Sequence, residues 1–262
     1  MAAHDRRIVA ERAAQAGADV AAASFRRPLE VETKAGPTDL VTEVDRNAQE
    51  AVVSVIRNAD PDGVVVAEED DLDGEVPDEG TAWVVDPVDG TRNYVAGSRL
   101  WATSVATVVD GETVAAATLM PAYGDEYALG PERVTRNGGP VGPSDRDDPA
   151  TFTVSPLGVP RGDRNEFAGL CDVLLHRTGD LRRLGCAQAA LAMVASGELD
   201  AVVATRPLDP WDSVAGVAMV QRAGGMVTDA LGDPWHPHAE GLVASNGNAH
   251  DALVDAARDV RE

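Results

Sequence analysis

One short stretch, WVVDPVDGT at residues 83–91, constrains the fold more than any other part of the chain. Its three leading apolar residues are typical of a strand that is buried on both faces. The proline then interrupts the hydrogen-bond ladder of that strand, and the glycine permits a tight turn. The pattern therefore predicts a buried strand that ends near Val85 in a stiff loop, with the carboxylates of Asp86 and Asp89 held on that loop.

Two carboxylates on a stiff loop are candidate ligands for a divalent cation. Hard cations bind carboxylate and carbonyl oxygens. The carbonyl of Val88, between Asp86 and Asp89, has no obvious partner in the ladder and could face the same ion. An ordinary polar turn is the alternative, because Asp, Pro and Gly are the commonest turn residues. We interpret the loop as a metal site, since other parts of the chain supply further ligands.

The charge of the chain limits its partners and its surroundings. Its 262 residues include 44 acidic and 22 basic side chains, for a net charge of −22, and Lys34 is the only lysine. Such a composition favours a halophilic source, because a cytosol of high salt screens the self-repulsion. An acidic mimic of nucleic acid would need one continuous acidic face, whereas these acids are scattered along the sequence. No basic stripe is present, so we expect no nucleic-acid partner.

The sequence contains no sign of a membrane protein or of a disulfide framework. No apolar run approaches the ~20 residues of a membrane-spanning helix. The first twelve residues are charged and contain no apolar signal core. We therefore expect a cytoplasmic protein that does not enter the membrane. Cys171 and Cys186 lack the paired spacing of a zinc site and are expected to be buried free thiols.

Apolar patterning divides the chain into an α+β first half and an α/β second half. Helices are expected at 4–24, 42–58, 165–178, 186–196, 209–223 and after residue 245. Strands are expected at 29–33, 63–67, 101–109, 113–120, 123–129, 151–155, 199–204, 226–229 and 242–245, and turns at 110–111 and 134–140. The run 141–150 is rich in Pro, Gly and Asp, as linkers are. We expect two closely packed subdomains, residues 1–145 and 146–262.

Three more acids stand at strand ends or helix starts, as Asp86 does. Glu68 follows a predicted strand, and Asp212 begins a predicted helix. Asp45 lies in the first turn of a helix that Thr42 is expected to cap, where a favourable charge is the simpler interpretation. None of the five histidines is near these acids in the sequence. An all-oxygen ligand set favours Mg²⁺ over Zn²⁺.

The turn that follows Asp89 is also a candidate anion site. If a helical turn begins there, the amides of Gly90 and Thr91 can hold a phosphate. The hydroxyl of Thr91 lies in the same turn. Several Mg²⁺ ions beside a phosphate site indicate metal-assisted hydrolysis of a phosphate ester.

With these motifs the chain resembles the inositol monophosphatase family of Mg²⁺-dependent, Li⁺-sensitive sugar phosphatases, which includes archaeal-type fructose-1,6-bisphosphatases. DPVDGT at 86–91 matches the first family signature, and WDSVAG at 211–216 matches the second. Glu68 matches a glutamate of the family's Gly-Glu-Glu stretch. Lys34 and Asp45 match the lysine and the aspartate on either side of its Asp-Leu-Val-Thr stretch. The resemblance spans essentially the whole chain.

The resemblance implies a fold, a reaction and residue roles. The fold is a layered αβαβα sandwich, and the protein is a homodimeric phosphoric monoester hydrolase with two or three Mg²⁺ ions, inhibited by Li⁺ and Ca²⁺. Thr91, paired with Asp45, orients the attacking water, and the amides of Gly90 and Thr91 bind phosphate. The implied metal ligands are Glu68, Asp86, the Val88 carbonyl, Asp89 and Asp212. The implied catalytic residues are Glu68, Thr91, Asp45 and Lys34.

Departures from the family bear on the substrate. In its animal members, a glutamate seven residues before the second signature's aspartate accepts hydrogen bonds from inositol, and this chain has Thr205 there. The sugar-binding helix start, usually Gly-Ser/Thr-Ala-Ala, reads GCAQ at 185–188. The candidate substrate contacts are Thr205, Arg206, Cys186 and Ala187.

Two arginines bear on the choice between inositol 1-phosphate and fructose 1,6-bisphosphate. Arg99 and Arg206 would meet a second phosphate, unless they form surface ion pairs. Alternative functions are the hydrolysis of another small metabolite, such as histidinol phosphate, 3'-phosphoadenosine 5'-phosphate or NADP, and a non-catalytic regulatory role. A regulatory relative would be expected to lose metal ligands, and the sequence lacks none of them.

Overall fold

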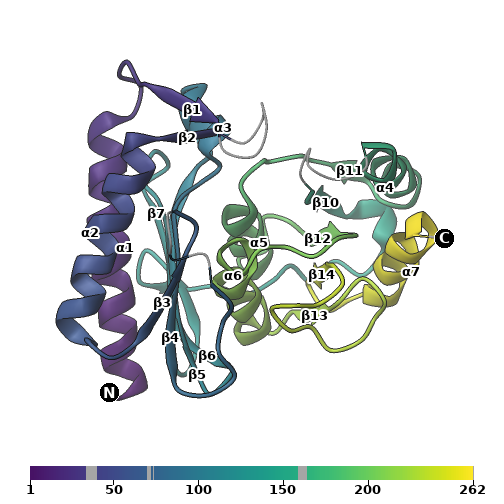
Figure 1. Ribbon diagram of the computed structural model, residues 1–262. Coiled ribbons are helices and arrows are strands. Elements are labelled where there is room, and N and C mark those ends of the chain that lie inside the picture. The colour runs from purple at the N-terminus through teal and green to yellow at the C-terminus, as the bar shows by residue number, and fades with distance from the viewer. Residues whose placement is uncertain (34–39, 70–71, 73, 159–163, 262) are drawn as a thin grey trace.

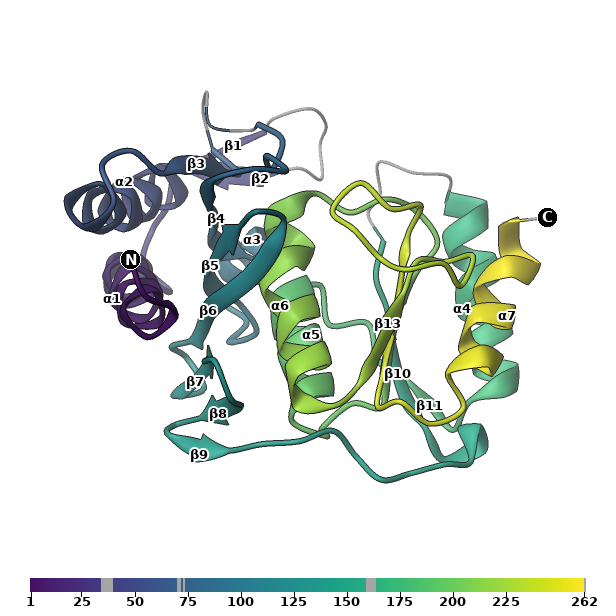
Figure 2. The same ribbon diagram turned by 90° about the horizontal axis from the view of Figure 1, so that it is seen from below.

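The computed structural model describes residues 1–33, 40–69, 72, 74–158 and 164–261. The elements stack in five layers, in the order helix, sheet, helix, sheet, helix, and two perpendicular views show the same order (Figures 1 and 2). The predicted αβαβα sandwich is confirmed. The three helical layers are α1 (Ala3–Ser24) with α2 (Glu43–Ala59), α5 (Ala187–Ala195) with α6 (Pro210–Ala223), and α4 (Arg164–Arg177) with α7 (His250–Arg261).

The first sheet has seven strands in the order β3-β4-β5-β6-β7-β8-β9. Its strands are β3 (Val64–Ala67), β4 (Thr81–Asp89), β5 (Ala102–Val109), β6 (Glu112–Met120), β7 (Asp125–Leu129), β8 (Val134–Arg136) and β9 (Gly139–Pro140). Only β3 and β4 are parallel neighbours. The predicted hairpin turn at 110–111 joins β5 to β6. A separate antiparallel pair consists of β1 (Val31–Thr33) and β2 (Leu40–Thr42).

The prediction of a turn over 134–140 is wrong in extent. Strands β8 and β9 occupy most of that segment and pair with each other, and the chain turns only at Asn137 and Gly138. Asn-Gly is a strong hairpin signal, and the flanking strands are too short to show a pattern of their own. The turn itself was therefore visible in the sequence, whereas the two short strands that extend the sheet at this edge were not.

Strand β4 continues through the loop in which we expected it to end. Asp86 pairs with Ser104 of β5 and Asp89 pairs with Ala102, so β4 advances three residues while β5 advances two. The extra residue is a β-bulge. Residues three apart in a regular strand face opposite sides of a sheet, and the bulge returns Asp89 to the side of Asp86. Pro87 lies within this irregularity, where a missing N–H is tolerated.

The second sheet has five strands in the order β11-β10-β12-β14-β13. They are β10 (Thr153–Pro156), β11 (Asp180–Leu181), β12 (Ala201–Ala204), β13 (Met226–Thr228) and β14 (Leu242–Ser245). β10 is parallel to β11 and β12, whereas β14 is antiparallel to β12 and β13. The predicted α/β half therefore contains a mixed sheet.

The central helices α5 and α6 pack against both sheets. One apolar core contains Val84 of β4, Leu191 of α5, Met219 of α6 and Val202 of β12, all buried. Helices that are apolar on most of their surface are stable only when they are covered on several sides. The Ala-rich sequence of α5 also lets neighbouring elements approach closely. The central layer thus joins the two halves of the chain.

A buried carboxylate fixes the connection between the halves. Asp200, just before β12, accepts hydrogen bonds from the N–H of Thr153 at 2.6 Å and from Arg146 at 3.0 Å, and also from the hydroxyl of Ser144. Ser144 and Arg146 belong to the run predicted as a linker. The division at 145/146 stays a prediction, but this segment is held at the second sheet.

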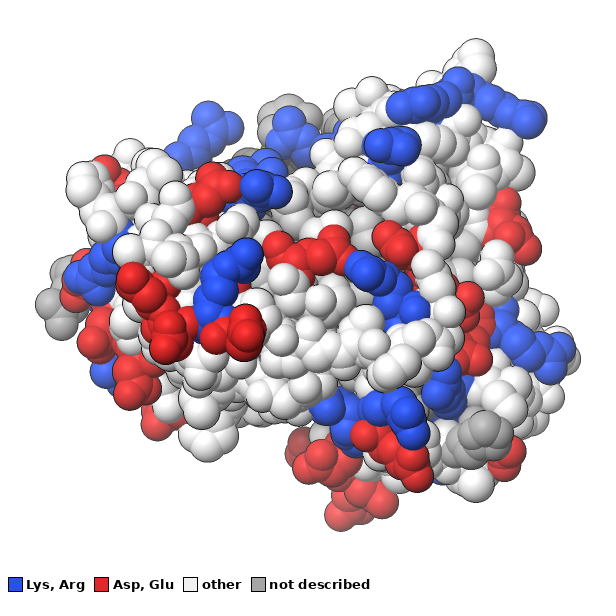
Figure 3. Space-filling model, turned by 180° about the vertical axis from the view of Figure 1, so that it is seen from behind, with Lys and Arg blue, Asp and Glu red and all other residues white. Residues whose placement is uncertain are grey.

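Two further observations concern the helices and the surface charges. Within the described ranges, no helix has both the length and the apolar character that crossing a membrane requires. Figure 3 shows acidic side chains spread over one face of the molecule, with basic ones between them. That face carries no single continuous acidic patch, as a mimic of nucleic acid would need.

Candidate metal centre

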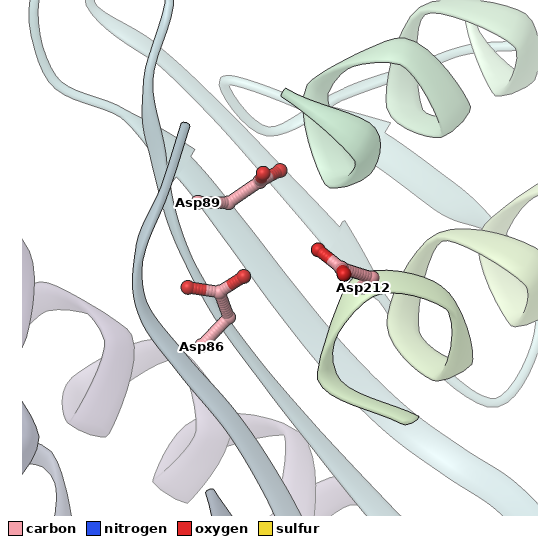
Figure 4. A group of neighbouring side chains, drawn as sticks. All are labelled: Asp86, Asp89 and Asp212. Carbon is pink, nitrogen blue, oxygen red and sulfur yellow. The ribbon is translucent and has the colours of Figure 1, made fainter. Parts of the chain in front are cut away.

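Three carboxylates from two layers of the sandwich meet at one point (Figure 4). Asp86 and Asp89 come from β4, and Asp212 comes from the first turn of α6. One oxygen of each carboxylate lies within 4.8 Å of one oxygen of each of the others. Carboxylate oxygens at this spacing can bind a common divalent cation. We call these three residues the carboxylate cluster.

Asp86 receives little compensation from the described residues for its buried charge. It is only 1% exposed, and its Oδ1 atom has no hydrogen-bond partner among the described residues. Burial raises the pKa of Asp86 well above its usual range, and the charges of Glu68, Asp89, Asp212 and Asp45 raise it further. A buried charge without a partner is costly. The cluster therefore fits a divalent cation, which would supply the missing charge.

Glu68, which follows β3, lies beside Asp86 of β4 because these two strands are parallel neighbours. Ala67, the last residue of β3, pairs with Val85 of β4, so the next residues along the two strands are Glu68 and Asp86. The Glu68 side chain is half-buried. Among the charged neighbours of Asp86, Glu68 raises its pKa the most. The structure thus brings this predicted ligand to the edge of the carboxylate cluster.

Asp89 joins the carboxylate cluster to the start of α5. Its Oδ1 accepts from the N–H of Ala187 at 3.1 Å, and its Oδ2 accepts from the N–H of Gln188 at 2.6 Å and from the thiol of Cys186 at 3.0 Å. Burial raises the pKa of Asp89, and these hydrogen bonds oppose the rise. Burial and the Asp89 charge also raise the pKa of Cys186, so this thiol stays protonated. The predicted substrate contacts Cys186 and Ala187 therefore lie next to a predicted metal ligand.

The hydroxyl of Thr91 lies between two acceptors. Thr91 begins α3 (Thr91–Val95), and its Oγ1 atom is 3.3 Å from Oδ1 of Asp45 and 3.2 Å from the carbonyl oxygen of Val88. The other oxygen of Asp45, Oδ2, accepts from the N–H and the hydroxyl of Thr42, the N-cap of α2, at 2.8 and 2.5 Å. Asp45 therefore makes both contacts considered from the sequence, one at the helix start and one at Thr91.

Gly90 allows β4 to turn directly into α3. Its φ angle is +84°, in the left-handed region that favours glycine. A Cβ atom at this position would also lie 3.0 Å from the carbonyl oxygen of Gly185 and 3.2 Å from Cβ of Cys186. Glycine therefore permits both the turn and the close approach of the segment that begins α5.

Thr205 and Arg206 lie beyond the end of β12. Thr205 is buried, and its carbonyl accepts a hydrogen bond from Arg261 of α7. Arg206 donates from Nε to Glu166 of α4 at 2.7 Å. The ion pair considered for Arg206 from the sequence is thus formed, and it engages this side chain at α4.

Two other basic residues were singled out in the sequence, Arg99 and Lys34. The Arg99 guanidinium stacks over the ring of Tyr123, 4.9 Å from its centroid. Lys34 lies outside the described residues.

Sequence reasoning missed two amide side chains that position these elements. Asn93 of α3 donates from Nδ2 to the carbonyls of Leu100 and Leu184 at 2.8 and 2.9 Å, and so ties α3 to the segment before α5. Gln188 of α5 is completely buried and bonds to α6. A glutamine within an Ala-rich apolar helix was a visible signal for Gln188. The sequence around Asn93 carried none.

Known proteins are similar to this chain in both sequence and fold. The chain matches the profile of the inositol monophosphatase family over residues 3–262. It is 34% identical over 234 residues, 88% of each chain, to a Thermotoga maritima protein named fructose-1,6-bisphosphatase/inositol-1-monophosphatase. It is 30% identical over 257 residues to Nus factor SuhB of Escherichia coli, covering 96% of this chain and 95% of that one. A solved structure of a Thermotoga maritima IMPase matches 98% of each chain with a TM-score of 0.89 at 29% identity.

The fold and the carboxylate cluster define a layered αβαβα protein with a candidate cation site between its first sheet and its central helices. The chain belongs to the inositol monophosphatase family. It is a phosphoric monoester hydrolase.

Proposed function

We propose that the protein hydrolyses a phosphate monoester of a sugar or polyol, either inositol 1-phosphate or fructose 1,6-bisphosphate or both, and that it requires Mg²⁺. The observation that carries the proposal is the buried Oδ1 atom of Asp86, which has no hydrogen-bond partner among the described residues. A cation at the carboxylate cluster would satisfy this atom. The names of the relatives support a sugar phosphate as the substrate.

The residues that would hold Mg²⁺ are Glu68, Asp86, the carbonyl of Val88, Asp89 and Asp212. We propose two or three ions per site, with Li⁺ and Ca²⁺ as inhibitors. When bound, Mg²⁺ acts as a Lewis acid on the phosphate and on the attacking water. The all-oxygen donor set supports Mg²⁺ over softer metals.

The hydroxyl of Thr91 would orient the attacking water. An ionised Asp45 can only accept hydrogen bonds, so the Thr91 proton points toward Asp45 or toward the carbonyl of Val88. The lone pairs of Thr91 Oγ1 are then available to accept a hydrogen bond from water. This arrangement would turn the water oxygen toward the phosphorus atom. The amides of Gly90 and Thr91 would bind the phosphate, and we place Lys34 near it.

The preference among substrates would come from groups that face the sugar. A carboxylate at position 205 could accept two hydroxyl hydrogen bonds, whereas Thr205 offers a neutral and shorter contact. Cys186 and Ala187, beside Asp89, are candidates for further sugar contacts. Arg206 is engaged by Glu166, so Arg99 becomes the better candidate for a second phosphate. We therefore propose that fructose 1,6-bisphosphate is at least as good a substrate as inositol 1-phosphate.

Phosphate release measured with both substrates tests the assignment. We expect activity in MgCl₂, no activity in chelator, and inhibition by LiCl and CaCl₂. Thr205→Glu should raise the ratio of kcat/KM for inositol 1-phosphate over fructose 1,6-bisphosphate by about ten- to a hundredfold, because it restores a charged hydrogen bond. Thr205→Val is the matched control, since it replaces the hydroxyl with a methyl group and keeps the shape of the side chain. Wild-type rates in metal-free buffer would overturn the Mg²⁺ requirement. A strong wild-type preference for inositol 1-phosphate that Thr205→Glu does not change would overturn the role of position 205.

A second candidate function is regulatory, and the 30% identity to proteins named Nus factor SuhB favours it. The two functions are compatible. All three members of the carboxylate cluster are present, so a regulatory role would not have to replace catalysis. A carboxylate variant without phosphatase activity separates them, since a regulatory role would survive that substitution. We also propose a cytoplasmic homodimer from a halophilic source, and sedimentation of the purified protein in high salt tests the dimer.

A further inference from the structure

We propose that Gln188 is a positioning residue, whose side chain joins α5 to α6 and thereby sets the separation of the Asp89 and Asp212 carboxylates. The inference rests on the proposed function, because it assigns to Gln188 a part in holding the cation that the carboxylate cluster would bind.

The side chain of Gln188 uses both ends of its amide on α6. Its Nε2 atom donates to the carbonyl of Trp211, and its Oε1 atom accepts from the N–H of Gly216 at 2.8 Å. These partners lie one residue before and four residues after Asp212. In a regular helix the N–H of residue 216 serves the carbonyl of residue 212. Gln188 therefore binds the same helical turn that carries the Asp212 carboxylate.

The backbone of Gln188 holds the other carboxylate. Its N–H donates to Oδ2 of Asp89 at 2.6 Å, the shortest of the three hydrogen bonds that tie Asp89 to the start of α5. Gln188 thus bonds directly to Asp89, and it bonds to the helical turn of α6 on which Asp212 stands. Asp89 and Asp212 come from opposite halves of the chain, so their spacing depends on contacts of this kind.

Glycine at position 216 makes room for the link. A Cβ atom on Gly216 would lie 2.4 Å from Cβ of Leu191 and 2.9 Å from Oε1 of Gln188, so a larger residue would push α5 and α6 apart. Packing alone does not call for an amide at position 188. An apolar side chain would fill this core without the cost of burying polar atoms. The glutamine is explained if the distance between the two helices must be held by hydrogen bonds.

Calorimetric titration of MgCl₂ into the metal-free protein, at constant ionic strength, tests the proposal with Gln188→Met and Gln188→Ala. Methionine keeps the length of the side chain and removes both of its hydrogen bonds, whereas alanine leaves a cavity. We expect the Kd for Mg²⁺ to rise about tenfold in both variants, the usual effect of losing a residue that orients metal ligands. Val194→Ala is the matched control, because it removes apolar volume from the last turn of the same helix. It should lower the Tm and leave the Kd unchanged.

Two outcomes would overturn the inference in distinguishable ways. If Gln188→Met folds with a lower Tm and binds Mg²⁺ within about twofold of wild type, the residue only packs the core, because loss of an orienting residue costs more than that. If the wild-type protein binds no Mg²⁺, the proposed function fails and the inference fails with it.

Discussion

Oγ1 of Thr91 lies 3.3 Å from Oδ1 of Asp45, so a hydroxyl at the start of α3 meets a carboxylate at the start of α2. The second oxygen of this carboxylate is occupied by Thr42, which it holds at the N-cap of α2. A single aspartate thus connects a helix start to the group proposed to orient water. Substitutions at Asp45 and Thr91 can separate these two tasks.

Asp45→Asn should lower kcat about a hundredfold, within the usual range for a group that handles a proton or orients water. The amide must direct its N–H toward Thr42 or toward Thr91, and in the latter case it occupies a lone pair of the Thr91 hydroxyl. The Tm should fall by only a few degrees, because Thr42 still accepts from the N–H of Val44. Phosphate-release kinetics and thermal melts measure the two effects.

Thr91→Val should reproduce the loss of kcat expected for Asp45→Asn, because valine matches threonine in shape and lacks the hydroxyl. Thr91→Ser is its control and should keep most of the activity. Full activity in Thr91→Val would mean that some other group orients the water.

Asp86→Asn should stabilise the metal-free protein and abolish its response to Mg²⁺. The substitution removes a buried charge that Glu68 and the other carboxylates repel, and it preserves the shape of the side chain. We expect the metal-free Tm to rise by several degrees, because 1 kcal/mol corresponds to about 2–4 °C for a chain of this size. Saturating MgCl₂ should raise the Tm of wild type but not of the variant. A lower metal-free Tm in Asp86→Asn would contradict the view that this charge is uncompensated.

The stability of the metal-free protein should fall as the pH rises toward neutrality. The pKa of Asp86 is raised above its ordinary value of 3.8, so the folded state binds this proton more tightly than the unfolded state does. The resulting stabilisation is fully present below the unfolded pKa and is lost as the pH rises through the folded pKa. Melts between about pH 5 and pH 8 in chelator should show a declining Tm, with a smaller decline in Asp86→Asn. Equal slopes for the two proteins would assign the effect to surface charge instead.

Low salt should destabilise the fold. With a net charge of −22, repulsion between surface carboxylates grows as the Debye length increases from ~3 Å at 1 M to ~30 Å at 0.01 M salt. Salt also weakens ion pairs such as Arg206 with Glu166, but acidic residues outnumber basic ones by 44 to 22, so repulsion dominates. We expect the Tm to rise with KCl up to at least ~0.5 M. An unchanged Tm after dialysis to low salt would contradict this explanation of the acidic surface.

Local signals predicted the elements whose determinants are local. The helix expected after Thr42 begins at Glu43 with Thr42 as its N-cap, and the Asp-Gly turn joins two strands as expected. The end of β4 was mispredicted because Pro87 and Gly90 are turn residues, whereas pairing with β5 continues through a bulge. Register and bulges depend on the partner strand, which a single sequence does not identify.

The candidate site, like the fold, has features that the sequence predicts and features that it does not. Acids at strand ends and helix starts were recognisable one at a time, and the structure brings Asp86, Asp89 and Asp212 together. The hydrogen bonds that these aspartates make to other parts of the protein were not recognisable from the sequence. The bonds from Asp89 to the start of α5 join residues that are far apart in sequence, and tertiary packing alone decides them. The sequence suggested an ion pair for Arg206, but for the same reason it did not identify Glu166 as the partner.

The division of the carboxylate cluster between β4 and α6 has a consequence for how the protein is made. A nascent chain presents Asp86 and Asp89 early, but Asp212 leaves the ribosome only after the linker, α4 and α5 have been synthesised. If the predicted subdomain 1–145 folds as a unit during synthesis, as domains generally do, the first sheet forms while one carboxylate of the cluster is still missing. A cation that needs all three carboxylates would then stabilise completed chains and leave truncated ones unprotected against cellular proteases.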